Sequence, residues 1–139
     1  MSATNVTIFT ATELQHTSER PQRLSVQYCT EGTSPYLHVS LGASVASVPV
    51  YLTDISKLQV ILSDIMHNRM RLDGEYEERF EIVKDRLYVI LTGYDTVKLQ
   101  FIARSGRIAS YTFHPDVNYK HSCLNRLYFA VTHIMMHKL

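Results

Sequence analysis

The stretch Asp54–Met66 reads DISKLQVILSDIM, and short runs of alternating apolar and polar residues precede it. Its apolar residues recur every three or four positions, which is the spacing of an amphipathic helix. The same order returns later in the chain, where alternating runs lead into a second amphipathic segment from about Asp116 to His137. The sequence therefore predicts an α+β fold of two pseudo-repeated ββββα units, with antiparallel sheets that are each backed by a helix.

Four strands are predicted in the first half, because the runs there alternate or are rich in β-branched residues. They are Val6–Ala11, Leu24–Cys29, Tyr36–Leu41 and Val45–Leu52. Pro49 favours an edge or a bulge for the fourth strand, since proline has no N–H to donate to a neighbouring strand. Thr53 or Asp54 is predicted to cap the first helix with its side-chain oxygen.

Four more strands are predicted in the second half, on the same alternation. They are Arg79–Val83, Leu87–Leu91, Val97–Ala103 and Ile108–Phe113. The last helix is predicted to start near Pro115, because proline is tolerated in a first helical turn. The acidic segment 72–78 links halves of approximately 1–71 and 77–139, and a length of 139 residues predicts a single domain, 1–139.

The last two strands of the second half are predicted to form a hairpin around a two-residue turn, Ser105-Gly106. This register places Arg104 opposite Arg107. It predicts a core face of Val97, Leu99, Phe101, Ala103, Ile108, Ser110, Thr112 and His114. The opposite face then carries Lys98, Gln100, Ile102, Arg104, Arg107, Ala109, Tyr111 and Phe113, and it is basic and aromatic.

Cations interleaved with aromatic side chains on a sheet face are typical of proteins that bind single-stranded nucleic acid. The arginines would bind phosphates and the tyrosines would stack on bases. The predicted nucleic-acid contacts are Lys98, Arg104, Arg107 and Tyr111, with Arg86 and Tyr88 as neighbours. The alternative is that the two arginines only extend into solvent at the tip of the hairpin.

The last helix carries more apolar residues than one stripe needs. The stripe consists of Leu124, Leu127, Tyr128, Val131, Ile134 and Met135. Phe129 and Met136 lie off this stripe, so we expect a homo-oligomer that forms through the C-terminal helix, with Phe129, His133 and Met136 at the interface. The alternative is a helix that is buried more deeply in its own core.

Enzymatic and metal sites find little support in the sequence. His133 and His137 have the four-residue spacing of a zinc-binding pair, but two ligands do not make a structural site, so no metal is expected. The chain contains no nucleophile elbow and no glycine-rich phosphate loop. We therefore expect neither enzymatic activity nor a cofactor. The acidic residues Glu75, Glu77, Glu78 and Glu81 fit a solvated linker face, or else a docking surface for a basic partner or charge mimicry of nucleic acid.

The composition limits the possible partners and compartments. Lys and Arg number 14 and Asp and Glu number 13, so a nucleic-acid binder with this net charge of +1 would need its cations on one face. No apolar run approaches the roughly 20 residues that cross a bilayer, so no membrane association is expected. Cys29 and Cys123 are far apart, and Met1–Thr4 does not begin a secretory signal. These features predict reduced thiols in the cytoplasm or another reducing compartment.

Two successive units of four strands and a helix resemble the Whirly and PUR-domain architecture. The resemblance rests on the order of elements around 54–70 and 116–139 and covers nearly the whole chain, without a matching motif. It implies antiparallel sheets backed by helices, oligomers formed through helices, and single-stranded DNA or RNA on the sheet faces.

The resulting hypothesis is a single-stranded nucleic-acid-binding protein. The alternative is a non-enzymatic protein–protein interaction module, such as an adaptor, an inhibitor or a subunit of a self-assembling particle. A third interpretation is a small-ligand pocket between sheet and helix.

Overall fold

The computed structural model describes residues 4–12, 23–30, 34–42, 46–67, 77–92, 96–113 and 122–137. The first half contains β1 (Thr4–Thr12), β2 (Arg23–Thr30), β3 (Tyr36–Leu41), β4 (Ala46–Val50) and α1 (Leu52–Met66). The second half contains β5 (Glu77–Val83), β6 (Leu87–Thr92), β7 (Val97–Ile102), β8 (Ile108–Phe113) and α2 (Ser122–His137). The predicted α+β class is confirmed.

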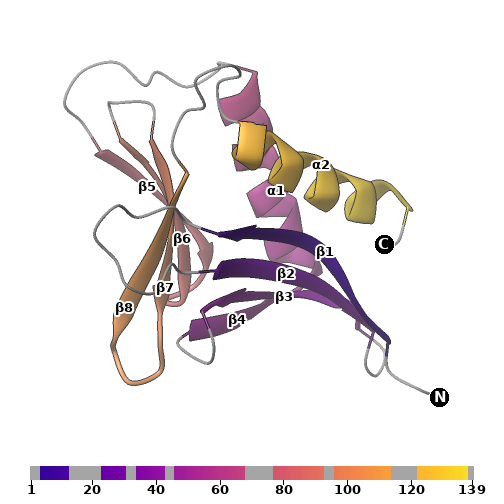
Figure 1. Cartoon of the computed structure of the whole chain (residues 1–139), viewed down its shortest axis with the longest axis horizontal. Coiled ribbons are helices and arrows are strands. Elements are labelled where there is room, and N and C mark those ends of the chain that lie inside the picture. Colours follow the sequence, from indigo (N-terminus) through magenta and orange to yellow (C-terminus); the bar gives the residue numbers. More distant parts are fainter. Residues whose placement is uncertain are drawn as a thin grey trace.

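The strands form two four-stranded antiparallel sheets, ordered β1-β2-β3-β4 and β5-β6-β7-β8. Each sheet is a meander, in which neighbours along the chain are also neighbours in space. Figure 1 shows that the strands of the two sheets run crosswise, that α2 lies above β1 in this view and that α1 passes behind β1. The helices contact each other, and α1 also contacts β5 and β3 while α2 contacts β1. Each helix therefore touches the sheet of the other half.

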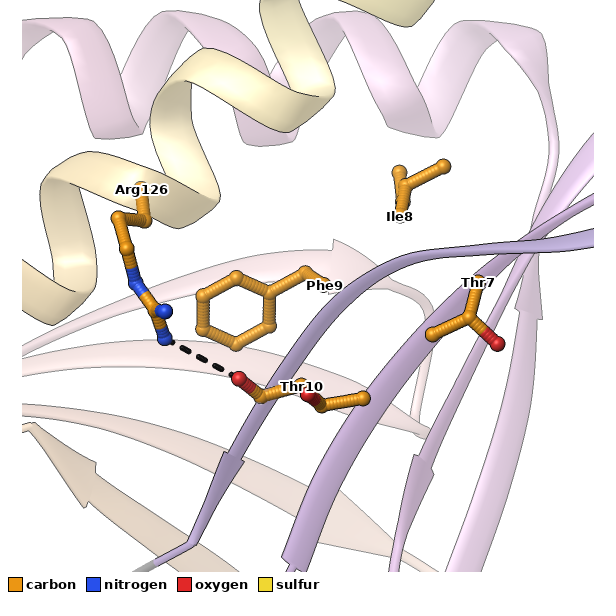
Figure 2. Close-up of a pocket in the computed structure, with 5 residues that line it drawn as sticks. All are labelled: Thr7, Ile8, Phe9, Thr10 and Arg126. Carbon is orange, nitrogen blue, oxygen red and sulfur yellow. Dashed lines mark hydrogen bonds between the residues drawn. The ribbon is translucent and has the colours of Figure 1, made fainter.

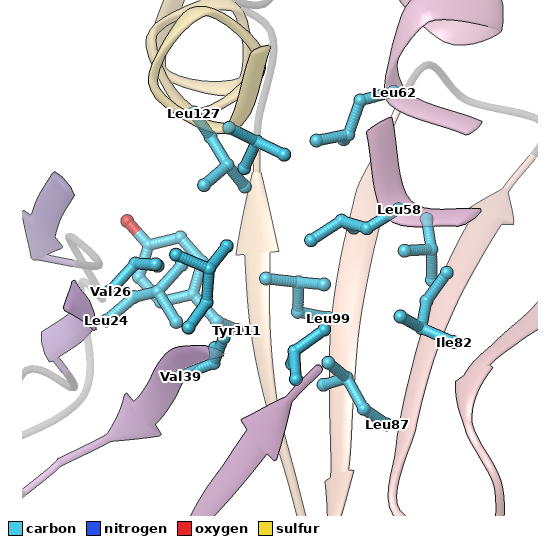
Figure 3. Packing of buried hydrophobic residues seen from close by; sticks show 14 of the residues in the cluster. Leu24, Val26, Val39, Leu58, Leu62, Ile82, Leu87, Leu99, Tyr111 and Leu127 are labelled. Atoms are coloured by element: carbon cyan, nitrogen blue, oxygen red, sulfur yellow. The ribbon is translucent and has the colours of Figure 1, made fainter. Parts of the chain in front are cut away.

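The inner faces of both sheets and both helices share one hydrophobic core (Figure 3). Strand β3 shows why its sequence forms this layer: Leu37, Val39 and Leu41 are buried, while the two residues between them are only half-buried. Successive side chains of a strand point to opposite faces, so strict alternation buries one face and leaves the other to solvent. Leu58 and Leu62 of α1 and Leu127 of α2 close the core from the helix side.

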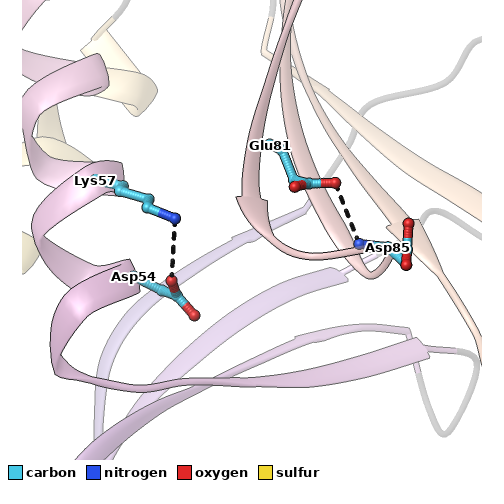
Figure 4. A network of polar contacts seen from close by, with 4 residues as sticks. All are labelled: Asp54, Lys57, Glu81 and Asp85. Atoms are coloured by element: carbon cyan, nitrogen blue, oxygen red, sulfur yellow. Dashed lines mark hydrogen bonds and ion pairs between the residues drawn. The ribbon is translucent and has the colours of Figure 1, made fainter.

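The strand positions follow the sequence prediction closely, and β4 is an edge strand as Pro49 indicated. The start of α1 differs from the prediction. Its N-cap is Tyr51, in extended conformation and without a side-chain cap hydrogen bond, so neither Thr53 nor Asp54 caps the helix. Asp54 instead lies in the first turn, 3.6 Å from the Lys57 ammonium group (Figure 4). The predicted start of the last helix, 114–121, and the linker residues 72–76 lie outside the described residues.

The predicted register of the β7–β8 hairpin is wrong by one residue. Ile102 pairs with Ile108, and the loop has three residues, Arg104, Ser105 and Gly106. The Gly106 N–H donates to the Ala103 carbonyl at 2.9 Å, and Gly106 has a φ of 89°. This is the three-residue hairpin loop in which a type I turn is followed by a residue with the left-handed backbone conformation. Because side chains alternate, a shift of one residue moves every β8 side chain to the other face.

Candidate functional site

The corrected register changes the outer face of the second sheet. We define the β5–β8 outer face by Arg79, Glu81, Tyr88, Lys98 and Gln100, which lie on β5, β6 and β7. Cross-strand pairing aligns Glu81 with Tyr88, and Tyr88 with Gln100. The buried residues of β7 alternate with Lys98 and Gln100, so this face points away from the core. Ile90 of β6 pairs with Arg79 and Lys98 and therefore lies on the same face, but it is buried, at 2% exposed.

Polar contacts join four of these side chains. The Tyr88 hydroxyl donates to the Glu81 carboxylate at 3.0 Å, and the Arg79 guanidinium lies over the Tyr88 ring, 5.2 Å from its centroid. Arg79 also donates to the Gln100 side-chain oxygen. The Asp85 backbone N–H donates to Glu81 at 3.3 Å (Figure 4). The hydrogen bond to the Glu81 carboxylate, more than any other cause, raises the pKa of the Tyr88 phenol above its ordinary value.

The charges on this face nearly cancel. Arg79 and Lys98 are cationic, but Glu81 is on the same face, and Glu77 follows the same alternation along β5. Nucleic-acid binding depends on cations that neutralise phosphates, and carboxylates beside them oppose it. The geometry therefore gives a mixed-charge surface rather than a basic one.

Tyr111 does not belong to this face, so its predicted role in stacking on a base is wrong. Its side chain is 4% exposed and lies in the core, with its ring centroid 4.9 Å from that of Phe113 (Figure 3). The physical reason is the three-residue hairpin loop, which turns Tyr111 inward, opposite Leu99. A side chain in this position cannot offer a ring face to a ligand.

The three predicted arginine contacts are not brought together. Arg86 donates to the Ile102 carbonyl at 2.8 Å and to the Ser47 carbonyl at 3.1 Å, so it links β4 of the first sheet to the second. Arg104 and Arg107 are exposed at the hairpin tip, as the alternative interpretation expected. The Ala103 N–H donates to the Arg107 carbonyl, so Arg104 and Arg107 are not directly opposite each other. Of the six predicted contacts, Lys98 and Tyr88 share one face.

The second candidate surface is the solvent side of α2. Phe129 is 61% exposed and Met136 is 71% exposed, and His133 between them is also exposed. Positions separated by three, four and seven residues lie on one side of a helix, so these three residues form one stripe, here called the α2 outer stripe. The opposite side of α2 is buried through Leu124 and Leu127.

The histidine pair at the end of α2 is close but incomplete as a metal site. The ring centroids of His133 and His137 are 4.6 Å apart. Among the described residues, no group of three or more His, Cys, Asp or Glu side chains could hold a metal ion. In the same part of the chain, neither helix combines the length and the apolar character needed to span a membrane.

The sequence did not identify two arginines that make contacts between elements, Arg79 and Arg126. Arg79 lies inside a predicted strand, but only the β5–β6 register shows that it meets Tyr88. Arg126 of α2 donates to the Thr10 carbonyl of β1, 116 positions away, and no local pattern marks such a contact. Comparison with protein families and with curated proteins found no match to this chain.

Proposed function

We propose that this protein is a non-enzymatic protein–protein interaction module that self-associates through α2. The observation that carries the proposal is the exposure of Phe129 and Met136 at 61% and 71% on one stripe of a helix whose other side is buried in the core. Burying a large apolar side chain is worth about 1.5–3 kcal/mol. Two such side chains on each copy supply a driving force for association that the monomer leaves unused.

The neighbouring helix supports the same interpretation. The α1 helix packs beside α2, where Gln59 donates to the Thr132 hydroxyl at 3.4 Å. It leaves Val60 exposed at 52%. The helix layer therefore exposes four large apolar side chains, Leu52, Val60, Phe129 and Met136, whereas the side chains that define the β5–β8 outer face are polar and mixed in charge.

The repeated order of four strands and a helix further supports a pseudo-repeat in which each half contributes one sheet and one helix. In this proposal the helices form the layer that assembles copies, and the outer faces of both sheets remain at the periphery. Superposition of β1–α1 on β5–α2 tests the pseudo-repeat, since a true repeat aligns the four strands and the helix together.

Sedimentation equilibrium tests the self-association. We expect a mass above that of the 16.0 kDa chain at micromolar concentration, with the fraction of oligomer rising with concentration. A mass of one chain at every concentration contradicts the proposal.

A second candidate function is the binding of single-stranded nucleic acid on the β5–β8 outer face. One observation favours it: the Arg79 guanidinium lies over the half-exposed Tyr88 ring, on the face that also carries Lys98. The buried Tyr111 and the carboxylates of this face make it the weaker candidate.

Titration of a fluorescent oligonucleotide tests this second candidate. Tyr88→Ala is expected to cost about 1–3 kcal/mol if the ring stacks on a base. Lys98→Gln is expected to lower the salt slope by about 0.7 if it contacts a phosphate. The matched control is Lys57→Gln on the exposed side of α1. No measurable binding at low salt, or equal effects of the two lysine variants, rules this candidate out.

A further inference from the structure

The two sheets have four edge strands, β1, β4, β5 and β8, and β8 differs from the other three. The outer side of an edge strand has backbone N–H and C=O groups that can pair with another chain. Proteins commonly block such an edge with proline, charged residues, a bulge or a covering element. Most residues of β5 are charged, for example, and α1 contacts this strand.

Arginine side chains block the edges of β1 and β4. A bulge interrupts the pairing of β1 with β2, and Arg126 of α2 donates to the Thr10 carbonyl of β1 at 3.1 Å (Figure 2). On β4, Pro49 has no N–H, and Arg86 donates to the Ser47 carbonyl at 3.1 Å. Another strand would have to displace these arginines to pair along either edge.

Strand β8 has none of these blocks among the described residues. Its sequence, IASYTF, contains no proline and no charged residue, and its pairing with β7 has no register shift. Isoleucine, tyrosine, threonine and phenylalanine all favour strands. Figure 1 shows that the β7–β8 hairpin projects away from both helices. In the described part of the chain, β8 is therefore the edge most open to a further strand.

The hairpin geometry identifies the backbone groups that point outward from β8. The Ala103 N–H donates to the Arg107 carbonyl, and in an antiparallel pair every second residue bonds to the same neighbour. The N–H and C=O groups of Ile108, Ser110 and Thr112 therefore point away from β7. Among the described residues, no hydrogen bond reaches these groups. The edge thus offers donors and acceptors at the two-residue spacing of an extended peptide.

The charges on the β7–β8 hairpin are all positive. Residues 96–113 contain Lys98, Arg104 and Arg107 and no Asp or Glu. Arg104 and Arg107 are exposed beside the start of β8, and Lys98 is the cross-strand partner of Thr112. Opposite charges across an interface favour the matching partner and disfavour others. A segment with acidic residues beside the start of β8 complements this hairpin.

We propose that the edge of β8 binds an extended acidic segment of another protein as an added antiparallel strand. In strand addition, backbone hydrogen bonds supply affinity and side chains supply specificity. Antiparallel pairing places the carboxyl-terminal end of the segment beside Arg107, so its acidic residues belong there. A peptide backbone matches the donors and acceptors of β8, whereas a phosphate backbone has no donors. The edge does not use Phe129 or Met136, so the proposal goes beyond self-association and stands whether or not α2 joins copies.

Amide hydrogen exchange of the wild-type protein labelled with ¹⁵N tests the proposal. The probe is the blocked peptide TVTVTEE, whose threonines pair with Thr112, Ser110 and Ile108 when its first glutamate lies opposite Arg107. We expect these three outward amides to exchange more slowly with the peptide, while the β8 amides that already bond to β7 change little. The same peptide with N-methyl groups on its threonines should not protect them. TVTVTQQ should bind about fivefold more weakly, since exposed ion pairs contribute little.

Variants at Ser110 separate the backbone from the side chain. Ser110→Pro removes an outward N–H and leaves the hydrogen bonds between β7 and β8 in place, so it should bind TVTVTEE at least about tenfold more weakly. The matched control is Ser110→Ala, which keeps the N–H and should bind like the wild type. The double variant Arg104→Gln/Arg107→Gln should bind TVTVTEE and TVTVTQQ equally.

The proposal is overturned if TVTVTEE protects none of the outward amides, if the N-methylated peptide protects them equally, or if TVTVTQQ binds as tightly. Protection that rises with protein concentration without peptide would assign the edge to a second copy. Equal protection by a single-stranded oligonucleotide would assign the edge to nucleic acid, and either result overturns the proposal. The wild-type measurements decide the matter even where Ser110→Pro folds poorly.

Discussion

At the scale of single residues, Gly106 decides which side chains of β8 enter the core. Its φ of 89° closes the three-residue loop, and the loop in turn places Tyr111 opposite Leu99. The sequence showed that a glycine-containing hairpin lies here. It could not distinguish a two-residue loop from a three-residue loop, because Ser105-Gly106 fits both and the local alternation of β8 is similar in either phase.

Gly106→Ala is predicted to destabilise the protein by about 1–2 kcal/mol, because the left-handed conformation is that much less favourable for an L-residue with a Cβ. Apart from the two neighbouring residues, no atom in the described part of the chain lies within 4 Å of the added Cβ, so strain in the backbone is the expected cause. Gly106→Asn should cost less, since asparagine tolerates this conformation better. Urea unfolding measures both variants, and equal stability of Gly106→Ala and wild type would refute the assigned loop.

Tyr88 gives a second prediction at this scale. Its raised pKa favours the neutral phenol in the folded state. The contribution of this pKa shift to the stability of the folded state is therefore fully present below the ordinary tyrosine pKa of about 10. It is lost as pH rises through the raised pKa. Glu81→Gln should move the Tyr88 ionisation to lower pH, because it removes the negative charge of the carboxylate to which the Tyr88 hydroxyl donates a hydrogen bond. Ultraviolet titration against Tyr88→Phe isolates this tyrosine, and an unmoved midpoint in Glu81→Gln would count against the contact.

At the scale of elements, periodicity in the sequence predicted most of the structure. The alternation of Tyr36–Leu41 gave the bounds of β3, and the apolar stripe of the last helix identified Leu124 and Leu127 as its buried side. The start of α1 was missed because Tyr51 caps the helix through its backbone carbonyl, which accepts from Asp54 and Ile55. A backbone cap leaves no residue type that a sequence pattern can identify.

The two sides of α2 are expected to respond differently to truncation. Leu127→Ala removes a side chain that is 1% exposed and should lower the free energy of unfolding by about 2–5 kcal/mol. Phe129→Ala removes an exposed side chain and should change the free energy of unfolding of the monomer by less than about 0.5 kcal/mol. Urea unfolding at low protein concentration compares them. Equal losses would mean that α2 is rotated from the described orientation.

At the scale of the whole molecule, contacts between distant segments determine what the surfaces can do. Arg86 reaches Ser47 across 39 positions, and Arg126 reaches Thr10 across 116. Neither contact has a local signature, which is why Arg86 was predicted to bind a ligand and Arg126 was overlooked. The exposure of Phe129 and Met136 was predictable, because both lie off a stripe that already supplies the core.

The central claim is that the α2 outer stripe joins copies of the chain. Sedimentation of the double variant Phe129→Ala/Met136→Ala tests it most directly, with Ile108→Ala as the control because Ile108 is equally exposed, at 60%, but lies on β8. Each truncation removes about 1.5–3 kcal/mol of burial, so the double variant should raise the dissociation constant at least ~100-fold. The control should sediment like the wild type. A wild-type oligomer that the double variant leaves intact would contradict the claim.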